Sequence, residues 1–448
     1  MSNKYVIKNV IGSYKNKSIN VSGDKSLSIR WVLFSSLADG KSKAFNLLKS
    51  EDVISALNAI KKLGIKYKLT KNYCEIFGKG LEGYNYKKNI VINAQNSGTL
   101  GRLIMGLLIN SEKKIKLIGD KSLSKRDFKR ISDPLTKFGA KFTLKEKKYL
   151  PLEVVGSKKT NPINFFEKRG SAQCKSSVIF AGFRTNGTTI IKAKKSRNHT
   201  ELLAKYLNLP IKINETKNFD YITVKKAKKI KPLNYNIPSD ISSAAFFIVL
   251  TALSENSSLI INNVNINKTR IGLIKILKLM GIKINFKNKK NYKGELVADI
   301  KVYSCKKIKP INCPTKFTSE AIDEFLLIFL VAAKADGISY FRKLSELNAK
   351  ESPRLEWGSK ILNYLGIKND VTKDSIKIYG NPELKVKNNI IIKNFLKDHR
   401  VFMTSVVAGL VFGGTWTIND KDSIKTSFPK FLSIIKELKK WKKTFLSK

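Results

Sequence analysis

The same arrangement of residues occurs six times along this chain. In each copy a short polar stretch leads directly into an apolar segment of helical length, which is followed by a turn and a short β-like run. The copies are 68 to 83 residues apart and begin near Asp24, Asn96, Ser171, Ser239, Ile322 and Asp398. Internal repetition constrains the architecture more strongly than any single motif. Because a helix N-terminus carries partial positive charge, six such starts also predict a site for anionic ligands.

Each repeat predicts one buried helix, one amphipathic helix and several short strands. The apolar segments leave little room for a polar face, as at 325–333, so they belong inside a domain. Amphipathic helices are expected at 50–64, 131–140, 269–281 and 354–366. Because a chain of 448 residues exceeds the usual size of one core, three repeats are expected to form each of two domains.

The boundary between the two domains is expected at the Pro-containing stretch YNIPSD, residues 235–240. The N-terminal domain then covers residues 24–237. The first strand, KYVIKNV, precedes the first repeat, and we expect it to pair within the C-terminal domain. That domain is therefore predicted to be discontinuous, with residues 1–23 and 238–448.

The net charge is +52, with 75 Lys and only 11 Arg. Such a charge is typical of nucleic-acid-binding proteins, and we keep that class as an alternative to an enzyme. The lysines are spread along the chain without a basic tail, which instead indicates a lysine-rich solvated surface. The same charge attracts small anionic substrates.

Composition also bears on metals and membranes. Four cysteines show no Cys-x-x-Cys spacing and only two histidines are present, so neither a zinc site nor a disulfide framework is expected, and no metal or cofactor is predicted. Apolar runs stay below the ~18 residues of a membrane helix, and the first residues show no signal or transit pattern. We therefore expect a cytoplasmic protein that has no membrane partner.

Arginine is scarce in this chain, so its positions are informative. An arginine is expected where a planar, permanently charged guanidinium group is needed. For any single arginine, the simplest interpretation is that it forms an ion pair on the surface. Six of them lie at or near the repeat starts, namely Arg30, Arg102, Arg126, Arg197, Arg354 and Arg400. Together with Lys25 and Lys350 they predict a site for two or more carboxylates or phosphates.

Three repeat starts carry further candidate binding groups. SGDKSLSIR places Lys25, Ser26 and Arg30 at one helix start, NSGT supplies Gly98 for close backbone approach, and SAQ supplies Ser171 and Gln173. Each motif alone is equally typical of an ordinary helix cap. The phosphate-binding pattern GxxxxGK[ST] does not occur around Gly98.

Two acids are candidates for proton transfer. Asp323 and Glu324 open an otherwise apolar helix, where capping is the simple interpretation, and Glu351 lies between Lys350 and Arg354, where a salt bridge is the simple one. If Asp323 and Glu351 face the same ligand, they form an acid and base pair.

Nine strings occur in the order seen in 5-enolpyruvylshikimate-3-phosphate synthases, also called 3-phosphoshikimate 1-carboxyvinyltransferases. They are GDKSLSIR, NSGT, GDKSLSKR, SAQCKS, SRNHTE, IDE, KESPR, DHR and TSFP. The chain resembles this family over nearly its whole length. The resemblance implies two inside-out α/β domains, each of three βαβαββ repeats, around an interdomain cleft. It also implies transfer of the carboxyvinyl group of phosphoenolpyruvate to the 5-hydroxyl of shikimate 3-phosphate, with release of phosphate.

The resemblance further implies a role for each matching residue. Asp323, Glu351 and Lys25 would be catalytic. Shikimate 3-phosphate would be bound by Lys25, Ser26, Arg30, Ser171, Gln173, Arg197, Asp323 and Lys350. Phosphoenolpyruvate would be bound by Lys25, Gly98, Arg126, Gln173, Arg354 and Arg400. These two small molecules would be the partners of a monomeric protein, with no specific nucleic acid.

The chain departs from the family pattern at Pro353, where KE[ST]DR normally has Asp, and proline restricts the backbone of Ser352. Lys425 lies one position from a phosphate-binding Lys of some members and is not assigned. The related UDP-N-acetylglucosamine enolpyruvyltransferases are the nearest alternative. They typically carry a loop bearing Cys or Asp, and no such Cys loop follows Arg102.

Overall fold

The computed structural model describes residues 3–440, and this part of the chain forms two compact units. Within the described residues, unit 1 comprises 3–22, 238–290 and 296–440, and unit 2 comprises 23–237 and 291–295. The predicted N-terminal domain, residues 24–237, differs from unit 2 at residue 23 and at residues 291–295. The predicted domain limits stay a prediction. The outermost parts of the predicted C-terminal domain, 1–2 and 441–448, lie outside the described residues.

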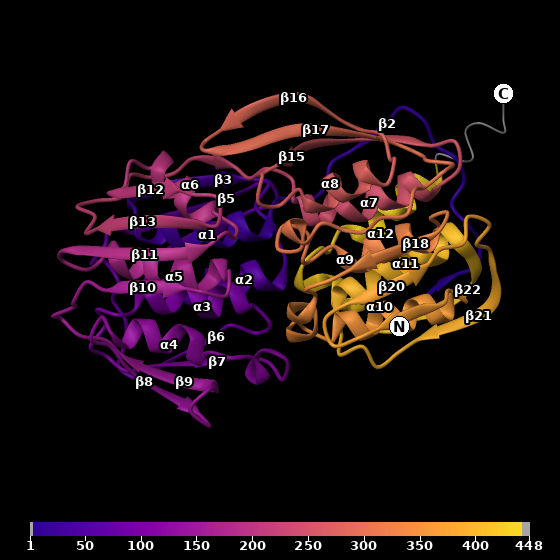
Figure 1. Cartoon of the computed structure of the whole chain (residues 1–448). Coiled ribbons are helices and arrows are strands. Elements are labelled where there is room, and N and C mark those ends of the chain that lie inside the picture. The colour runs from indigo at the N-terminus through magenta and orange to yellow at the C-terminus, as the bar shows by residue number, and fades with distance from the viewer. Residues whose placement is uncertain (1–2, 441–448) are drawn as a thin grey trace. The chain divides into compact units, whose positions relative to one another are not determined.

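Unit 2 contains three four-stranded sheets, and each sheet is accompanied by two helices (Figure 1). The first group consists of β14 (Tyr235–Asn236), β3 (Asp39–Phe45), β5 (Tyr73–Lys79) and β4 (Lys66–Leu69), with α1 (Lys25–Ser36) and α2 (Glu51–Lys62). The second consists of β6 (Ile90–Asn93), β7 (Ile115–Ile118), β9 (Tyr149–Val155) and β8 (Lys141–Lys145), with α3 (Gly98–Leu107), η1 (Leu123–Lys125) and α4 (Lys129–Thr136). The third consists of β10 (Asn164–Glu167), β11 (Thr188–Lys194), β13 (Phe219–Lys225) and β12 (Ile211–Glu215), with α5 (Ala172–Gly182) and α6 (His199–Tyr206).

Unit 1 repeats this plan, but two of its three sheets have three strands. Its first group is β16 (Ile284–Tyr292), β17 (Glu295–Tyr303), β15 (Ser258–Asn265) and β2 (Lys17–Ile19), with α7 (Ile241–Leu253) and α8 (Gly272–Leu279). Its second is β18 (Ile338–Phe341), β20 (Ile376–Tyr379) and β19 (Asn369–Val371), with η2 (Thr315–Phe317), α9 (Phe325–Ala333), η3 (Ser345–Ala349) and α10 (Arg354–Tyr364). Its third is β1 (Tyr5–Ile7), β22 (Gly413–Ile418) and β21 (Val386–Ile392), with α11 (His399–Phe412), η4 (Lys421–Thr426) and α12 (Phe431–Lys440).

Strand register confirms the βαβαββ repeat. β6 pairs in parallel with β7, β7 pairs antiparallel with β9, and β9 pairs antiparallel with β8. The parallel pair of β6 and β7 needs a crossover connection, which contains α3. The strands β8 and β9 are antiparallel and form a simple hairpin. The first strand of the chain, β1, pairs antiparallel with β22 of unit 1, which confirms the expected pairing of KYVIKNV.

The six apolar segments form α1, α3, α5, α7, α9 and α11, and every residue of α7 and α9 is buried. Five of these helices begin with a side-chain cap, as where Asp24 accepts a hydrogen bond from the amide of Leu27 at 2.8 Å. The exception is α9, whose preceding residue Glu324 makes no capping bond. Capping of α9 by the Glu324 side chain is therefore wrong, and this carboxylate instead accepts a hydrogen bond from Ser242.

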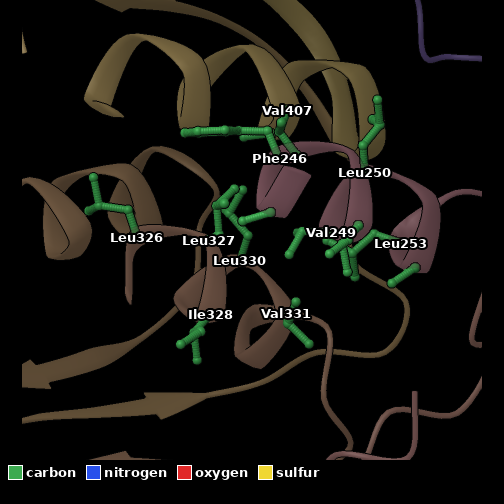
Figure 2. Close-up of a cluster of buried hydrophobic side chains, with 14 of the residues drawn as sticks. Phe246, Val249, Leu250, Leu253, Leu326, Leu327, Ile328, Leu330, Val331 and Val407 are labelled. Carbon is green, nitrogen blue, oxygen red and sulfur yellow. The ribbon is translucent and has the colours of Figure 1, made fainter. Parts of the chain in front are cut away.

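The core of unit 1 is the contact between α7, α9 and α11. Figure 2 shows Phe246 and Leu250 of α7 on the side of Val407 of α11, and Val249 of α7 on the side of Leu330 of α9. These side chains are excluded from water, which supplies the main favourable term in folding. Helices that are apolar on all sides thus lie inside the unit, as the resemblance implied.

The sheets have one buried and one exposed face. In β11 and β13 buried and exposed residues alternate along the strand. On the outer face Lys192 extends over the rings of Phe166, Phe219 and Tyr221, with its ammonium 4.8 to 5.7 Å from their centroids. Lysine stems can cover apolar surface while the charge remains in water. This arrangement accounts for part of the lysine excess without any nucleic acid.

Gly106 is expected to be required for the packing of α3 against α5. A Cβ atom at this position would overlap the carbonyl oxygen of Ser177, which belongs to the backbone of α5. We predict that Gly106→Ala destabilises the protein by about 3 kcal/mol, measured as a lower urea midpoint of unfolding. Gly101→Ala on the same helix is the control, because its Cβ would meet only side-chain atoms, the ring of Phe128 at 3.3 Å and Cβ of Ala94 at 3.5 Å. Equal midpoints for the two variants would contradict the prediction.

Candidate active site

The start of α1 holds two of the predicted ligands in unit 2. Lys25 and Ser26 are half-buried in the first turn, immediately after the Asp24 cap. The ammonium of Lys25 lies 3.0 Å from the carboxylate of Asp52, in the first turn of α2. Asp52 therefore restricts the position of the Lys25 ammonium, a role that the sequence interpretation missed.

Arg30 is buried and links three helices of unit 2. Its Nε donates to Thr200 Oγ1 at 2.7 Å, its Nη2 donates to Ser176 Oγ at 3.1 Å, and its Nη1 donates to the carbonyl oxygen of Ser26 at 3.1 Å. Burial lowers the pKa of Arg30 to about 10, and the charges of Glu201 and Asp24 oppose that shift. The group stays protonated at neutral pH, so α5 and α6 orient a buried cation.

The start of α3 brings Gly98 and Arg126 together. A Cβ atom at Gly98 would lie 3.2 Å from Arg126 Nη1, so the missing side chain leaves room beside this guanidinium. Arg126 Nη2 donates to Asn96 Oδ1 at 3.1 Å and to Ser122 Oγ at 3.3 Å. Gly98 and Arg126 therefore lie side by side, and their binding of an anionic group stays a prediction.

At the start of α5, Ser171 caps the helix by accepting a hydrogen bond from the amide of Cys174 at 3.3 Å. Gln173 bonds to α3 in two ways: Oε1 accepts from Arg102 at 2.5 Å, and Nε2 donates to Thr99 at 3.0 Å. The hydroxyl of Ser171 is thus engaged locally, whereas Gln173 connects two repeat starts.

Arg102 was singled out in the sequence but received no role. It is buried, and burial lowers its pKa to about 10, with the positive charges of Arg130 and Arg126 lowering it further. Arg197, in the loop before α6, similarly acts on Arg30 through its positive charge. Unit 2 therefore gathers several arginines close enough to repel one another, which favours binding of an anion.

In unit 1 the predicted residues form one cluster around Asp323. Its carboxylate lies 3.2 Å from the ammonium of Lys350, 3.5 Å from Arg354 Nη1 and 4.0 Å from Arg400 Nη2. Arg400 Nη1 also donates to the backbone oxygen of Asp323 at 2.6 Å. Glu351 pairs with Arg354 Nη2, so both predicted proton-transfer acids contact the same guanidinium. Asp323 and Glu351 thus lie close together within this unit, and their action as an acid and base pair stays a prediction.

Asp398 is the residue of this cluster that the sequence interpretation left without a role. It is fully buried and accepts hydrogen bonds from Arg354 Nε at 2.8 Å and from Ser352 Oγ at 2.8 Å, and it also caps α11. Burial raises the pKa of Asp398, but the charge of Arg354 lowers it by more, so its pKa lies below the ordinary value. Arg354 and Glu351 keep their contact despite Pro353, which stands immediately before α10.

The fourth repeat start, for which no ligand-binding residue was predicted, is linked to this cluster by a chain of polar contacts. Asp240 pairs with Arg270 at 3.4 Å, and Arg270 Nη2 donates to Ser242 Oγ at 2.8 Å. Ser242 in turn donates to Glu324 Oε1 at 2.5 Å, and Glu324 lies 3.6 Å from Arg400. The fourth start therefore holds the carboxylate that faces Arg400.

The described residues also bear on the remaining candidates. Lys425 is exposed and pairs with Asp422 at 3.3 Å, within η4. Over residues 3–440 no three His, Cys, Asp or Glu side chains are grouped as metal ligands. Every helix in that range is too short or too polar to cross a lipid bilayer.

Comparisons with known proteins cover nearly the whole chain. The family model described as "EPSP synthase (3-phosphoshikimate 1-carboxyvinyltransferase)" matches residues 11–435. A 3-phosphoshikimate 1-carboxyvinyltransferase of Ruthia magnifica subsp. Calyptogena magnifica is 38% identical over 421 residues, which are 94% of this chain and 94% of the relative. One of Sulfurihydrogenibium sp. is 36% identical over 425 residues, which are 94% and 97% of the two chains.

Solved structures agree with the sequence relatives. The EPSP synthase of Acinetobacter baumannii superposes with a TM-score of 0.85 at 32% identity, over 97% of this chain and 98% of that one. The enolpyruvyl transferase NikO of Streptomyces tendae has a TM-score of 0.75 at 13% identity, over 98% of both chains, and this likeness concerns the fold alone. The relatives bear the name of the main predicted family and not that of the UDP-N-acetylglucosamine enzymes.

The repeat architecture, the ordered motifs and these relatives agree, and the chain belongs to the EPSP synthase (3-phosphoshikimate 1-carboxyvinyltransferase) family, the enolpyruvyl transferases of the shikimate pathway.

Proposed function

We propose that this chain transfers the carboxyvinyl group of phosphoenolpyruvate to the 5-hydroxyl of shikimate 3-phosphate and releases phosphate. The observation that carries the residue-level proposal is the cluster of unit 1, where Asp323 and Glu351 lie on one guanidinium and beside Lys350 and Arg400. The reaction needs proton transfer at two atoms and cationic groups for the phosphates and carboxylates of both substrates. Both kinds of group are present there.

Shikimate 3-phosphate carries one phosphate and one carboxylate. We assign its binding to Lys25, Ser26, Arg30, Ser171, Gln173, Arg197, Asp323 and Lys350. Support comes from the buried fork of Arg30, which Thr200 and Ser176 hold in place, and from the neighbouring charge of Arg197. Arginine forks match carboxylate and phosphate oxygens in geometry as well as in charge.

Phosphoenolpyruvate is assigned to Lys25, Gly98, Arg126, Gln173, Arg354 and Arg400. The open position at Gly98 beside Arg126 supports the assignment on unit 2. On unit 1, Arg400 is more exposed than Arg354, whose side chain is only 2% exposed and already bonded to Asp398. We therefore assign direct contact chiefly to Arg400, with Arg354 contributing its charge and orienting the acids.

The overall chemistry requires one proton acceptor and one proton donor. The 5-oxygen forms a bond to the central carbon of phosphoenolpyruvate as its proton passes to Asp323, and the methylene carbon gains a proton from Glu351. The Glu351 carboxylate then takes a proton back from that carbon as phosphate departs, which restores the double bond. Lys350 and Arg354 lie beside Asp323 and hold its carboxylate in place, and a carboxylate can accept the proton. Lys25, held near Asp52, would balance negative charge on the substrates.

We further propose that the protein works as a monomer in the cytoplasm. All of the assigned residues lie on one chain, so the reaction requires no second copy. Both substrates are phosphorylated and multiply charged, and such molecules do not cross an apolar bilayer unaided. Gel filtration with light scattering would test the monomer, because a mass near twice 50.6 kDa would contradict it.

The reaction itself is tested by phosphate release. Purified protein mixed with shikimate 3-phosphate and phosphoenolpyruvate at neutral pH is expected to release one phosphate per product formed. Each substrate alone should release none, which serves as the control. Folded protein that releases no phosphate from the pair would contradict the proposed function.

Asp323→Asn tests the proton acceptor. The amide keeps the shape of the carboxylate but cannot accept the proton, so we expect turnover to fall by about 10²- to 10⁴-fold. Calorimetry should show that shikimate 3-phosphate still binds. Asp336→Asn is the matched control, because this acid is exposed in the loop after α9. Unchanged turnover in Asp323→Asn would remove Asp323 from the mechanism.

Arg126→Ala tests the donor site. Loss of a charged hydrogen-bond donor should raise the KM for phosphoenolpyruvate by about 10- to 100-fold, because such bonds contribute about 1.5–3 kcal/mol. The KM for shikimate 3-phosphate should change less. Arg342→Ala provides the control, since this arginine is bonded to Asn312 in unit 1 and lies outside the assigned set. Equal effects on both KM values would show that the assignment of Arg126 is wrong.

A further inference from the structure

One buried contact between a histidine and a glutamate of unit 2 has no part in the assigned set. Nδ1 of His199 lies 2.6 Å from Oε1 of Glu295, and both side chains are buried, with 0% and 1% exposed. A carboxylate that is fully removed from water is costly unless it is paired and hydrogen-bonded. Glu295 lies 96 positions along the chain from His199, so their contact is a product of the tertiary structure.

Glu295 reaches this position on the tip of a hairpin. β16 and β17 form a long hairpin with its turn at Lys293 and Gly294, and residues 291–295 belong to unit 2 (Figure 1). The tip is held at several points. Tyr292 accepts a hydrogen bond from the amide of Asn236 at 2.9 Å, and its ring lies 5.4 Å from that of Tyr235.

The packing of the tip against α6 is close. A Cβ atom at Gly294 would lie 2.8 Å from the carbonyl oxygen of Leu202, and the backbone there has a φ of +85°, which favours glycine. Leu202 belongs to α6, the helix that His199 opens. The tip therefore fixes α6 both through its backbone and through the His199 imidazole.

The first turn of α6 leads directly to an assigned substrate residue. Thr200 follows His199, accepts a hydrogen bond from Arg30 Nε at 2.7 Å and donates one to Ser176 at 2.7 Å. Ser176 accepts a second bond from Arg30 at 3.1 Å. The orientation of the Arg30 fork thus depends on where the start of α6 is held.

The charge of Glu295 also affects the pKa values of neighbouring groups. Burial lowers the pKa of Arg30, and Glu295 is among the acids that oppose this. Burial raises the pKa of Tyr235 above its ordinary value, and the charge of Glu295 raises it further. Glu295 therefore lies close to both Arg30 and Tyr235.

We infer that Glu295 is a positioning residue for the binding of shikimate 3-phosphate, which it supports by holding His199 and, through the first turn of α6, the Thr200 hydroxyl that orients Arg30. The inference rests on the proposed function. Glu295 makes no contact with substrate in this scheme, and it acts entirely through its neighbours. It links a hairpin that lies outside every sequence motif to Arg30 of unit 2.

Substitution of Glu295 provides the first test. Glu295→Ala in the full chain is expected to raise the KM for shikimate 3-phosphate by about 10-fold, while the KM for phosphoenolpyruvate changes less than about 2-fold. Glu295→Gln keeps an oxygen acceptor for His199 Nδ1–H and should recover most of the affinity. Tyr292→Phe loosens the same tip without touching His199, so it should leave both KM values unchanged.

The outcomes distinguish a failure of the proposed function from a failure of the positioning role of Glu295. Phosphate release by the unaltered chain is measured first, and its absence would count against the proposed function. A normal rate in the unaltered chain, together with unchanged or equally raised KM values in Glu295→Ala, would overturn the positioning role. An equal effect of Tyr292→Phe would also overturn it, because the tip would then act only as a structural support.

A second measurement needs no destabilising variant. The chain contains only two histidines, His199 and His399, so protein labelled at histidine gives two sets of imidazole NMR signals, which a His399→Gln variant assigns. Addition of shikimate 3-phosphate should shift the His199 signals, because the Arg30 fork and the start of α6 respond together. Saturating shikimate 3-phosphate with no shift at His199 would contradict the inference even if Glu295→Ala failed to fold.

Discussion

The burial of six largely apolar helices is the constraint on which the other features of this protein depend. Because α7 and α9 are buried at every residue, the sheets must lie outside them and present one polar face to water. The backbone amides at each buried helix start then need acceptors, which Asp24, Ser171 and Asp398 supply. Polar and charged residues are therefore concentrated at the helix starts, and the candidate site follows from the same arrangement that forms the cores.

Burying arginines at these starts is possible because each one is matched by a partner. Arg354 is held by Asp398 and Glu351, and the negative charges raise its pKa above the ordinary value although burial lowers it. Arg30 lacks such an adjacent carboxylate and is held by hydroxyls instead, so burial lowers its pKa. A cation satisfied by neutral groups keeps its net charge for an anionic ligand, whereas one paired with acids chiefly orients those acids. This difference distinguishes Arg30 of unit 2 from Arg354 of unit 1.

The lysine-rich composition does not contradict this organisation. Lys192 and Lys43 lie over aromatic rings on the outer strand faces, away from the buried helix starts. Their stems cover apolar surface that a sheet with one exposed face leaves open. These lysines thus lie on the outside of unit 2, whereas Arg30 and Arg102 are buried at the helix starts.

The repeat length, the apolar segments and the amphipathic helices predicted the helices and the repeated sheet plan, because burial follows from hydrophobic periodicity along the chain. The motif order also identified Asp323, Glu351, Lys350, Arg354 and Arg400, which the fold gathers in one cluster. Asp398, Asp52 and Glu295 could not receive their roles in this way. Their partners, such as Arg354 and His199, lie far away in sequence, and periodicity carries no information about such contacts. Only tertiary packing decides which buried charge meets which partner, because that pairing depends on distances between elements and not on the residues beside each charge.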